Sequence, residues 1–183
     1  MSSSQRVSWI AVMTALCVST NYMLVGVVNV KFMDLIVFVS GLMFGAAIGG
    51  SVGVLTWLVY GTINPYGFSL PILVATSLGE SLYGIVGGIL RDSGSRSSFQ
   101  GSGVPGFISL RFAVVGFLLT FVYDLFTNIV SGVTAGIPIA TALLVGIPFA
   151  LIHEISNAAL FFVGVVPLMG AIRHLPLGGL ESA

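Results

Sequence analysis

The sequence predicts an all-α membrane protein, a compact bundle of six transmembrane helices that forms one domain over residues 1–183. Two observations carry this prediction. Hydrophobic residues make up 56% of the chain and charged residues only 7%, whereas a typical soluble domain is about 25% charged. The charges are also far apart, because none lies between Arg6 and Lys31 and only Asp34 lies between Lys31 and Glu80. Apolar stretches of this length are typical of membrane-spanning helices.

Charges, glycines and a turn motif delimit the first three spans. The first span is expected over residues 7–27, which is too long for the apolar core of a signal peptide. A second span begins near Asp34 and a third near Gly49, and both are short. The chain then breaks at residues 64–67, Asn-Pro-Tyr-Gly, because proline cannot donate a backbone hydrogen bond and glycine permits a positive φ.

Three longer spans are expected in the second half. The fourth covers residues 70–90 and leads into residues 91–106, which are rich in Ser and Gly and predict a flexible loop. The fifth span covers residues 108–130. The sixth reaches about Pro167, with a kink expected at Pro148.

The basic residues predict the orientation of these spans. An even number of spans places both termini on the same side of the membrane. By the positive-inside rule, that side is the cytoplasmic side of the cell membrane. Lys31, on the opposite side, is expected to reach toward lipid headgroups or, alternatively, to pair with Asp34. The basic residues on the side of the termini are Arg6, Arg91, Arg96, Arg111 and Arg173.

Composition and missing motifs exclude several functions. A net charge of zero with six basic residues argues against a nucleic-acid-binding surface. The single cysteine, Cys17, excludes a disulfide framework and a Cys-based metal cluster. No phosphate-binding glycine loop occurs, and His153-Glu154 begins like the zinc motif H-E-x-x-H but continues to Asn157. We therefore expect no enzyme, no metal and no cofactor.

Polar residues within the apolar spans are the candidates for function. A charged side chain near the bilayer centre costs about 2.5–3.5 kcal/mol, so such residues face the interior of a bundle. On three helices they recur at helical spacing, as Thr120, Asp124 and Asn128, as Thr76, Glu80 and Tyr83, and as His153 and Asn157. They either form hydrogen bonds that hold the helices together or line a polar cavity, and their number favours a cavity open to the outside. The predicted binding residues within the spans are Asp34, Glu80, Tyr83, Asp124, Asn128, His153, Glu154 and Asn157.

Aromatic residues gather near the outer end of the third span. Trp57 and Tyr60 lie on that span, and Tyr66 lies in the turn that follows. One interpretation is an interfacial aromatic belt. The other is a wall or lid over a flat, ring-containing ligand, which adds these three residues to the predicted site.

Short motifs along the chain point to a family. They are Ala11-Val12-Met13-Thr14-Ala15, residues 64–67, Gly79-Glu80 and the run Tyr-Asp-Leu-Phe-Thr-Asn at residues 123–128. With its length and expected topology, the chain resembles over essentially its whole extent the substrate-binding S components of energy-coupling factor (ECF) transporters. These are the prokaryotic vitamin importers of the ABC superfamily.

The resemblance implies a mechanism and partners. An S component captures a vitamin or its precursor at an outward-facing site. It then docks in the lipid bilayer onto a transmembrane scaffold subunit that two ATPase subunits drive. By this resemblance, Ala11 and Ala15 contact the scaffold, and Glu80, Tyr83, Asp124 and Asn128 line the ligand site. The outer loops, with Asn64, complete that site.

The ligand and the mode of transport stay open at this stage. Acids outnumber cations around the expected site and favour a ligand with a positive charge or several donors, such as thiamin, although His153 or Lys31 could hold an anion. The alternative function is an autonomous proton- or sodium-coupled carrier with Asp124 and Glu154 as coupling acids. Internal repeats would favour a carrier, and the two halves show no convincing self-similarity. An intramembrane enzyme at His153-Glu154 lacks a second set of metal ligands.

Overall fold

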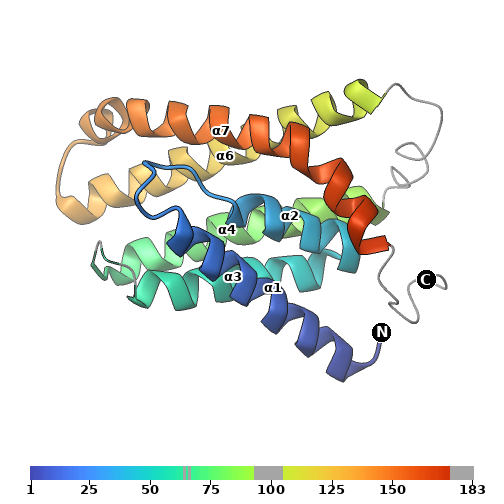
Figure 1. Cartoon of the computed structure of the whole chain (residues 1–183). Coiled ribbons are helices and arrows are strands. Elements are labelled where there is room, and N and C mark those ends of the chain that lie inside the picture. The colour runs from blue at the N-terminus through green and yellow to red at the C-terminus, as the bar shows by residue number, and fades with distance from the viewer. Residues whose placement is uncertain (64, 66, 93–104, 174–183) are drawn as a thin grey trace.

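The computed structural model describes residues 1–63, 65, 67–92 and 105–173, and within these residues helices are the only regular secondary structure. The N-terminal end of α1 and the C-terminal end of α7 lie at the same end of the bundle, here called the terminal end (Figure 1). The C-terminal ends of α3 and α6 lie at the other end, here called the pocket end. The helices are α1 (Ser3–Met23), α2 (Met33–Phe44), α3 (Ala46–Ile63), α4 (Leu70–Leu90), α6 (Pro105–Ala135) and α7 (Ile139–Arg173).

The structure confirms an all-α chain with the character of a membrane protein, but six full spans are not seen. Four helices are long and apolar enough to cross a bilayer: α3, α4, α6 and α7. Helix α1 is long enough, with 21 residues, but its polar residues at both ends lower its hydropathy. Helix α2 has only 12 residues. At a rise of 1.5 Å per residue it covers about 18 Å, well short of the roughly 30 Å hydrocarbon core.

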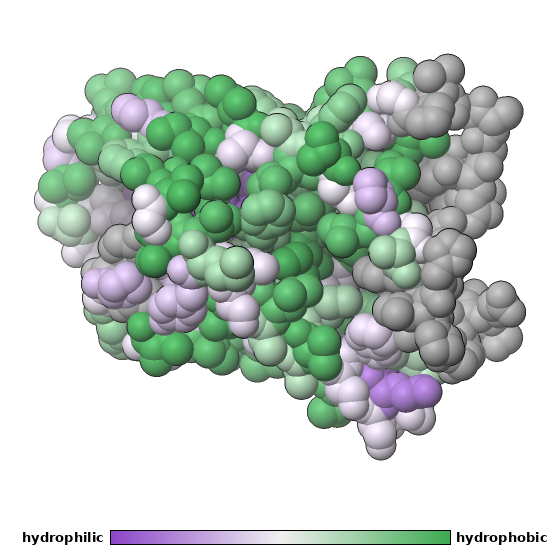
Figure 2. Space-filling model, viewed as in Figure 1, coloured by the Kyte–Doolittle hydropathy of each residue, from purple (hydrophilic) through white to green (hydrophobic). Residues whose placement is uncertain are grey.

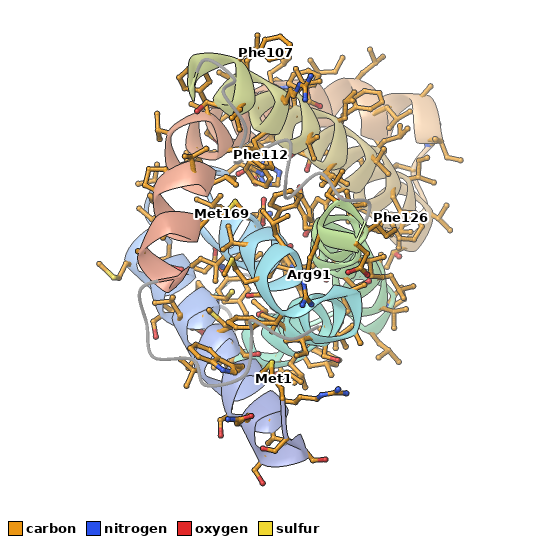
Figure 3. All side chains as sticks on the ribbon, turned by 90° about the vertical axis from the view of Figure 1, so that its right-hand side faces the viewer. Met1, Arg91, Phe107, Phe112, Phe126 and Met169 are labelled. Carbon is orange, nitrogen blue, oxygen red and sulfur yellow. The ribbon has the colours of Figure 1, made fainter. Side chains whose placement is uncertain are left out.

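Helix α2 forms the centre of the bundle. All of its 12 residues are buried, and it packs against α1, α3, α4 and α7. A helix that is hydrophobic on every side lies in apolar surroundings, and the neighbouring helices provide them here. Around it, α3 pairs with α4, and α6 pairs with α7 over most of their lengths. Seen from the terminal end, Phe112 and Met169 point into the bundle, whereas Phe107 and Phe126 point outward (Figure 3).

Glycines set the contact between α2, α3 and α4. Gly45 separates α2 from α3 and has a φ of 100°, a conformation that other residues rarely adopt. A Cβ atom added at Gly84 of α4 would overlap the backbone of Gly49 in α3. Added Cβ atoms at Gly41, Gly49 and Gly53, which are spaced by four or eight residues, would also meet backbone atoms closer than 3.0 Å. These glycines therefore permit close backbone packing, as small residues do between membrane helices.

Replacing Gly84 with alanine should destabilise the bundle. The added methyl group meets backbone atoms that cannot rotate away, and overpacking of this kind costs about 1–3 kcal/mol. We expect a lower melting temperature of the purified protein in detergent. The control is Gly170→Ala in α7, where an added Cβ has no neighbour within 4 Å. Equal melting temperatures for the two variants would contradict the close contact.

The outer surface is apolar. Large hydrophobic side chains on the outer faces of α6 and α7 are exposed, among them Leu118, Leu144 and Ile155. Figure 2 shows apolar residues over most of the visible face, with hydrophilic ones mainly toward the two ends. This distribution suits a surface that lipid covers.

Candidate functional site

A cavity of about 520 Å³ lies at the pocket end. Its wall comes from the last part of α3, the first turns of α4, the last third of α6 and the first third of α7. The chain between α1 and α2 completes it. Of the predicted site residues, Trp57, Tyr60, Asp124 and Asn128 line this cavity.

Two hydrogen bonds hold the chain between α1 and α2 against the cavity. Asn29 donates from Nδ2 to the carbonyl oxygen of Phe149 in α7 over 2.8 Å. Its φ of 50° is a left-handed conformation that asparagine tolerates well. Tyr22, near the end of α1, donates from its hydroxyl to the carbonyl oxygen of Ile63 over 2.8 Å. These contacts attach the end of α1 to the end of α3 and the chain between α1 and α2 to α7.

Aromatic rings form one wall of the cavity. Trp57 stacks with Tyr123 at an angle of 29° between ring planes and a centroid distance of 6.5 Å. Tyr60 meets Trp57 edge-on. The Nζ atom of Lys31 lies 5.5 Å from the Trp57 ring centroid and 5.0 Å from that of Tyr123. Both distances lie within the range of a cation–π interaction.

Beneath the cavity, His153 bridges two aspartates from different helices. Its Nδ1 lies 3.0 Å from Oδ1 of Asp124, and its Nε2 lies 2.7 Å from Oδ2 of Asp34. His153 is fully buried and the two aspartates are nearly so. This group of three, here called the Asp–His–Asp trio, joins α2, α6 and α7.

The trio continues into a buried polar network. Asn157, one turn beyond His153, donates from Nδ2 to Oδ2 of Asp34 and approaches Oγ1 of Thr120 at 2.8 Å. The Tyr83 hydroxyl donates to the same Thr120 oxygen over 2.9 Å. The polar stripes predicted on three helices therefore meet in the interior. Tyr83 and Asn157 lie in this network and not on the cavity wall.

Proton counting fixes the net charge of the trio. Each of its two hydrogen bonds needs one shared proton, because a carboxylate can only accept. With two protons on Asp34, His153 and Asp124 together, the trio carries one net negative charge whichever group holds each proton. A buried charge of this kind is retained only where it is hydrogen-bonded.

The remaining predicted acids lie elsewhere. Glu80 is fully buried and accepts a hydrogen bond from Nε1 of Trp57 over 3.1 Å, so it supports the aromatic wall from behind. Glu154 lines a separate cavity of about 260 Å³ between α6 and α7, to which Asp124 and Asn128 also contribute. Asn64 and Tyr66 lie outside the described residues.

The predicted docking residues lie on the surface of α1. Ala11 and Ala15 are both exposed, whereas Met13, Thr14, Cys17 and Asn21 form the buried face of the same helix. The small residues therefore do not pack against the rest of this chain.

Sequence reasoning missed several residues of the cavity. Ser131 continues the stripe of Thr120, Asp124 and Asn128 at a three-residue spacing, a signal that could have found it. Asn21 and the lining contributed by residues 24–30 lie outside that stripe. Tyr123 and Thr127 flank the same stripe and are not among the predicted site residues, yet both line the cavity. Neither Asn21 nor Asn128 nor Ser131 makes a side-chain hydrogen bond within the described part of the chain. These groups are available to a ligand.

Comparisons of the chain with protein-family models, with curated proteins and with solved structures find no match.

Proposed function

We propose that this protein is the substrate-capture subunit of an ECF-type importer in a prokaryotic cell membrane, with a vitamin or vitamin precursor as its ligand. Separate scaffold and ATPase subunits energise it. In this proposal all six helices lie in the membrane, with α1 and α2 inserted among the four longer ones. Both termini face the cytoplasm, and the pocket end faces outward.

The observation that carries the proposal is the cavity at the pocket end. Ligand sites are typically concave, mostly apolar, and furnished with a few polar groups that fix orientation. The cavity volume of about 520 Å³ lies within the usual range for small molecules. Trp57 and Tyr123 offer ring surfaces, and Asn21, Asn128 and Ser131 offer polar groups for hydrogen bonds.

The exposed face of α1 supports the second half of the proposal. Ala11 and Ala15 lie on neighbouring turns and leave a shallow surface beside Val12 and Leu16, which are also exposed. Small residues permit a second membrane helix to approach closely. A capture subunit without its own nucleotide site needs such a contact to reach an energised partner.

The Asp–His–Asp trio favours the second candidate, an autonomous proton-coupled carrier. Chains of buried Asp, Glu and His residues mark proton pathways in many transporters. Here the chain runs from Asp124 at the cavity through His153 and Asp34 to Asn157. A carrier of this kind moves solute without ATP.

Co-purification and reconstitution separate the two candidates. We expect the tagged, full-length protein, extracted in mild detergent from its native membrane, to retain an integral membrane subunit and two ATPases. In liposomes, the protein alone should not accumulate the small molecule that mass spectrometry finds bound to it, even with an imposed proton gradient. Accumulation driven by the gradient, with no retained subunit, would replace the capture function by the carrier.

A further inference from the structure

Lys31 lines two cavities at the pocket end. It is the only lysine, and its half-buried side chain lies where the main cavity meets a neighbouring one of about 410 Å³. Trp57 and Tyr60 line both cavities as well.

Within the described residues the Lys31 ammonium has no carboxylate at ion-pair distance, although it interacts with the charges of Asp34 and Glu80 from farther away. The ion pairs there within 4 Å involve His153 with Asp34 and with Asp124. The Nζ atom lies over the faces of the Trp57 and Tyr123 rings. Ring faces attract a cation but accept no strong hydrogen bond, so the three ammonium hydrogens remain available to an acceptor.

The acids near the cavity are already engaged. Both carboxylate oxygens of Asp124 lie within 3.1 Å of Nδ1 of His153, and Glu80 accepts from Trp57 behind the wall. A cationic ligand would have Asp124 as its one charged partner on the wall, and it would compete with Lys31 for the two rings. An anionic ligand gains an unpaired ammonium at the same rings.

We infer that the cavity binds a planar ring compound that carries an anionic group, a carboxylate or a phosphate, with the anion at Lys31 and the ring against Trp57 and Tyr123. The inference rests on the proposed capture function and names its substrate class. The count of acids and cations in the sequence favours a cationic ligand. The inference reverses that expectation, because most of these acids form hydrogen bonds inside the bundle.

The test uses the single lysine as a reporter. Reductive methylation with ¹³C-formaldehyde labels Lys31 and the N-terminal amine, and it keeps the positive charge on Lys31. The effect of ligand charge on binding is then compared with four ring probes of similar size: benzoate, phenyl phosphate, benzamide and benzyltrimethylammonium. Each is titrated to millimolar concentration while the ¹³C-methyl resonances are followed by NMR. The N-terminal amine at the terminal end serves as the internal control.

We expect benzoate or phenyl phosphate to shift the Lys31 resonance and to bind about tenfold or more tightly than benzamide, a difference of about 1.4 kcal/mol. Benzoate and phenyl phosphate also distinguish a carboxylate site from a phosphate site. Binding to unlabelled variants is followed by the fluorescence of Trp57 in a Trp9→Phe background. Lys31→Met should abolish the preference, Lys31→Arg should retain it, and Arg6→Met, a charge removal at the terminal end, should leave it unchanged.

Three results would overturn the assignment: equal binding of benzoate, phenyl phosphate and benzamide, tighter binding of benzyltrimethylammonium, or no shift with any probe. Tighter binding of benzyltrimethylammonium that Lys31→Met improves further would identify a cation site at the rings. None of these results bears on co-purification with ECF subunits. Conversely, failure to co-purify would remove the proposed function and leave the charge preference of the cavity in place.

Discussion

Replacing His153 with leucine should lower the free energy of unfolding by about 3–5 kcal/mol, the cost of removing one partner from a buried charged group. The substitution removes the hydrogen bonds to Asp34 and Asp124. Two nearly buried carboxyl groups then face an apolar side chain. Unfolding of the purified protein in mixed detergent micelles, followed by circular dichroism, measures the change.

A double-variant cycle distinguishes the trio from general damage to the core. Asp34→Leu alone should also be strongly destabilising, because it leaves His153 and Asn157 without their shared acceptor. The variant that carries both substitutions should lose less stability than the sum of the two single losses, since contacting residues are not additive. Strictly additive losses, or a His153→Leu variant within about 1 kcal/mol of the parent, would refute the role of the trio.

Much of the helical architecture was predictable because turn signals are local. The fourth span was expected over residues 70–90, and α4 is Leu70–Leu90. The third span was expected to begin near Gly49, and α3 begins at Ala46, directly after Gly45. Helix α6 runs from Pro105 to Ala135, longer at both ends than predicted, because the flanking residues are small or apolar and do not stop a helix. The kink expected at Pro148 stays a prediction.

The central position of α2 was not predictable. In a soluble protein, the apolar face of a helix points inward, but in a membrane protein both lipid and the protein core are apolar. The residues of α2 therefore look the same whether they face lipid or other helices. Only the shortness of α2 distinguishes it from a full membrane span, because 12 residues are too few to cross a bilayer.

The polar interior was predicted as a set but not residue by residue. Helical spacing correctly grouped Thr120 with Asp124 and His153 with Asn157, and these residues meet in one network. Spacing within one helix does not specify the rotation of its neighbours. It therefore did not separate Asp124, which reaches the cavity, from Glu80 and Tyr83, which do not.

Under the proposed ECF function, a tryptophan at Ala11 or Ala15 should separate the protein from the scaffold and ATPase subunits. We expect the amount of scaffold and ATPase subunits that co-purify with the tagged protein to fall about tenfold or more, and uptake by cells with the complete transporter to fall to background. The physical reason is that helices which meet through small residues lose their close contact when a large side chain separates them. Both alanines are exposed, so the indole ring can project outward without disturbing the bundle.

Two further measurements make this result specific. Leu118→Trp places the same side chain on the exposed face of α6, and it should leave co-purification unchanged. The melting temperature of Ala11→Trp and Ala15→Trp should match that of the parent protein, because neither alanine packs against the other helices of the bundle. Normal co-purification of both Ala11→Trp and Ala15→Trp would contradict docking through α1. A large drop in their melting temperature would instead show that this face of α1 supports the fold, so that the partner must bind to another surface.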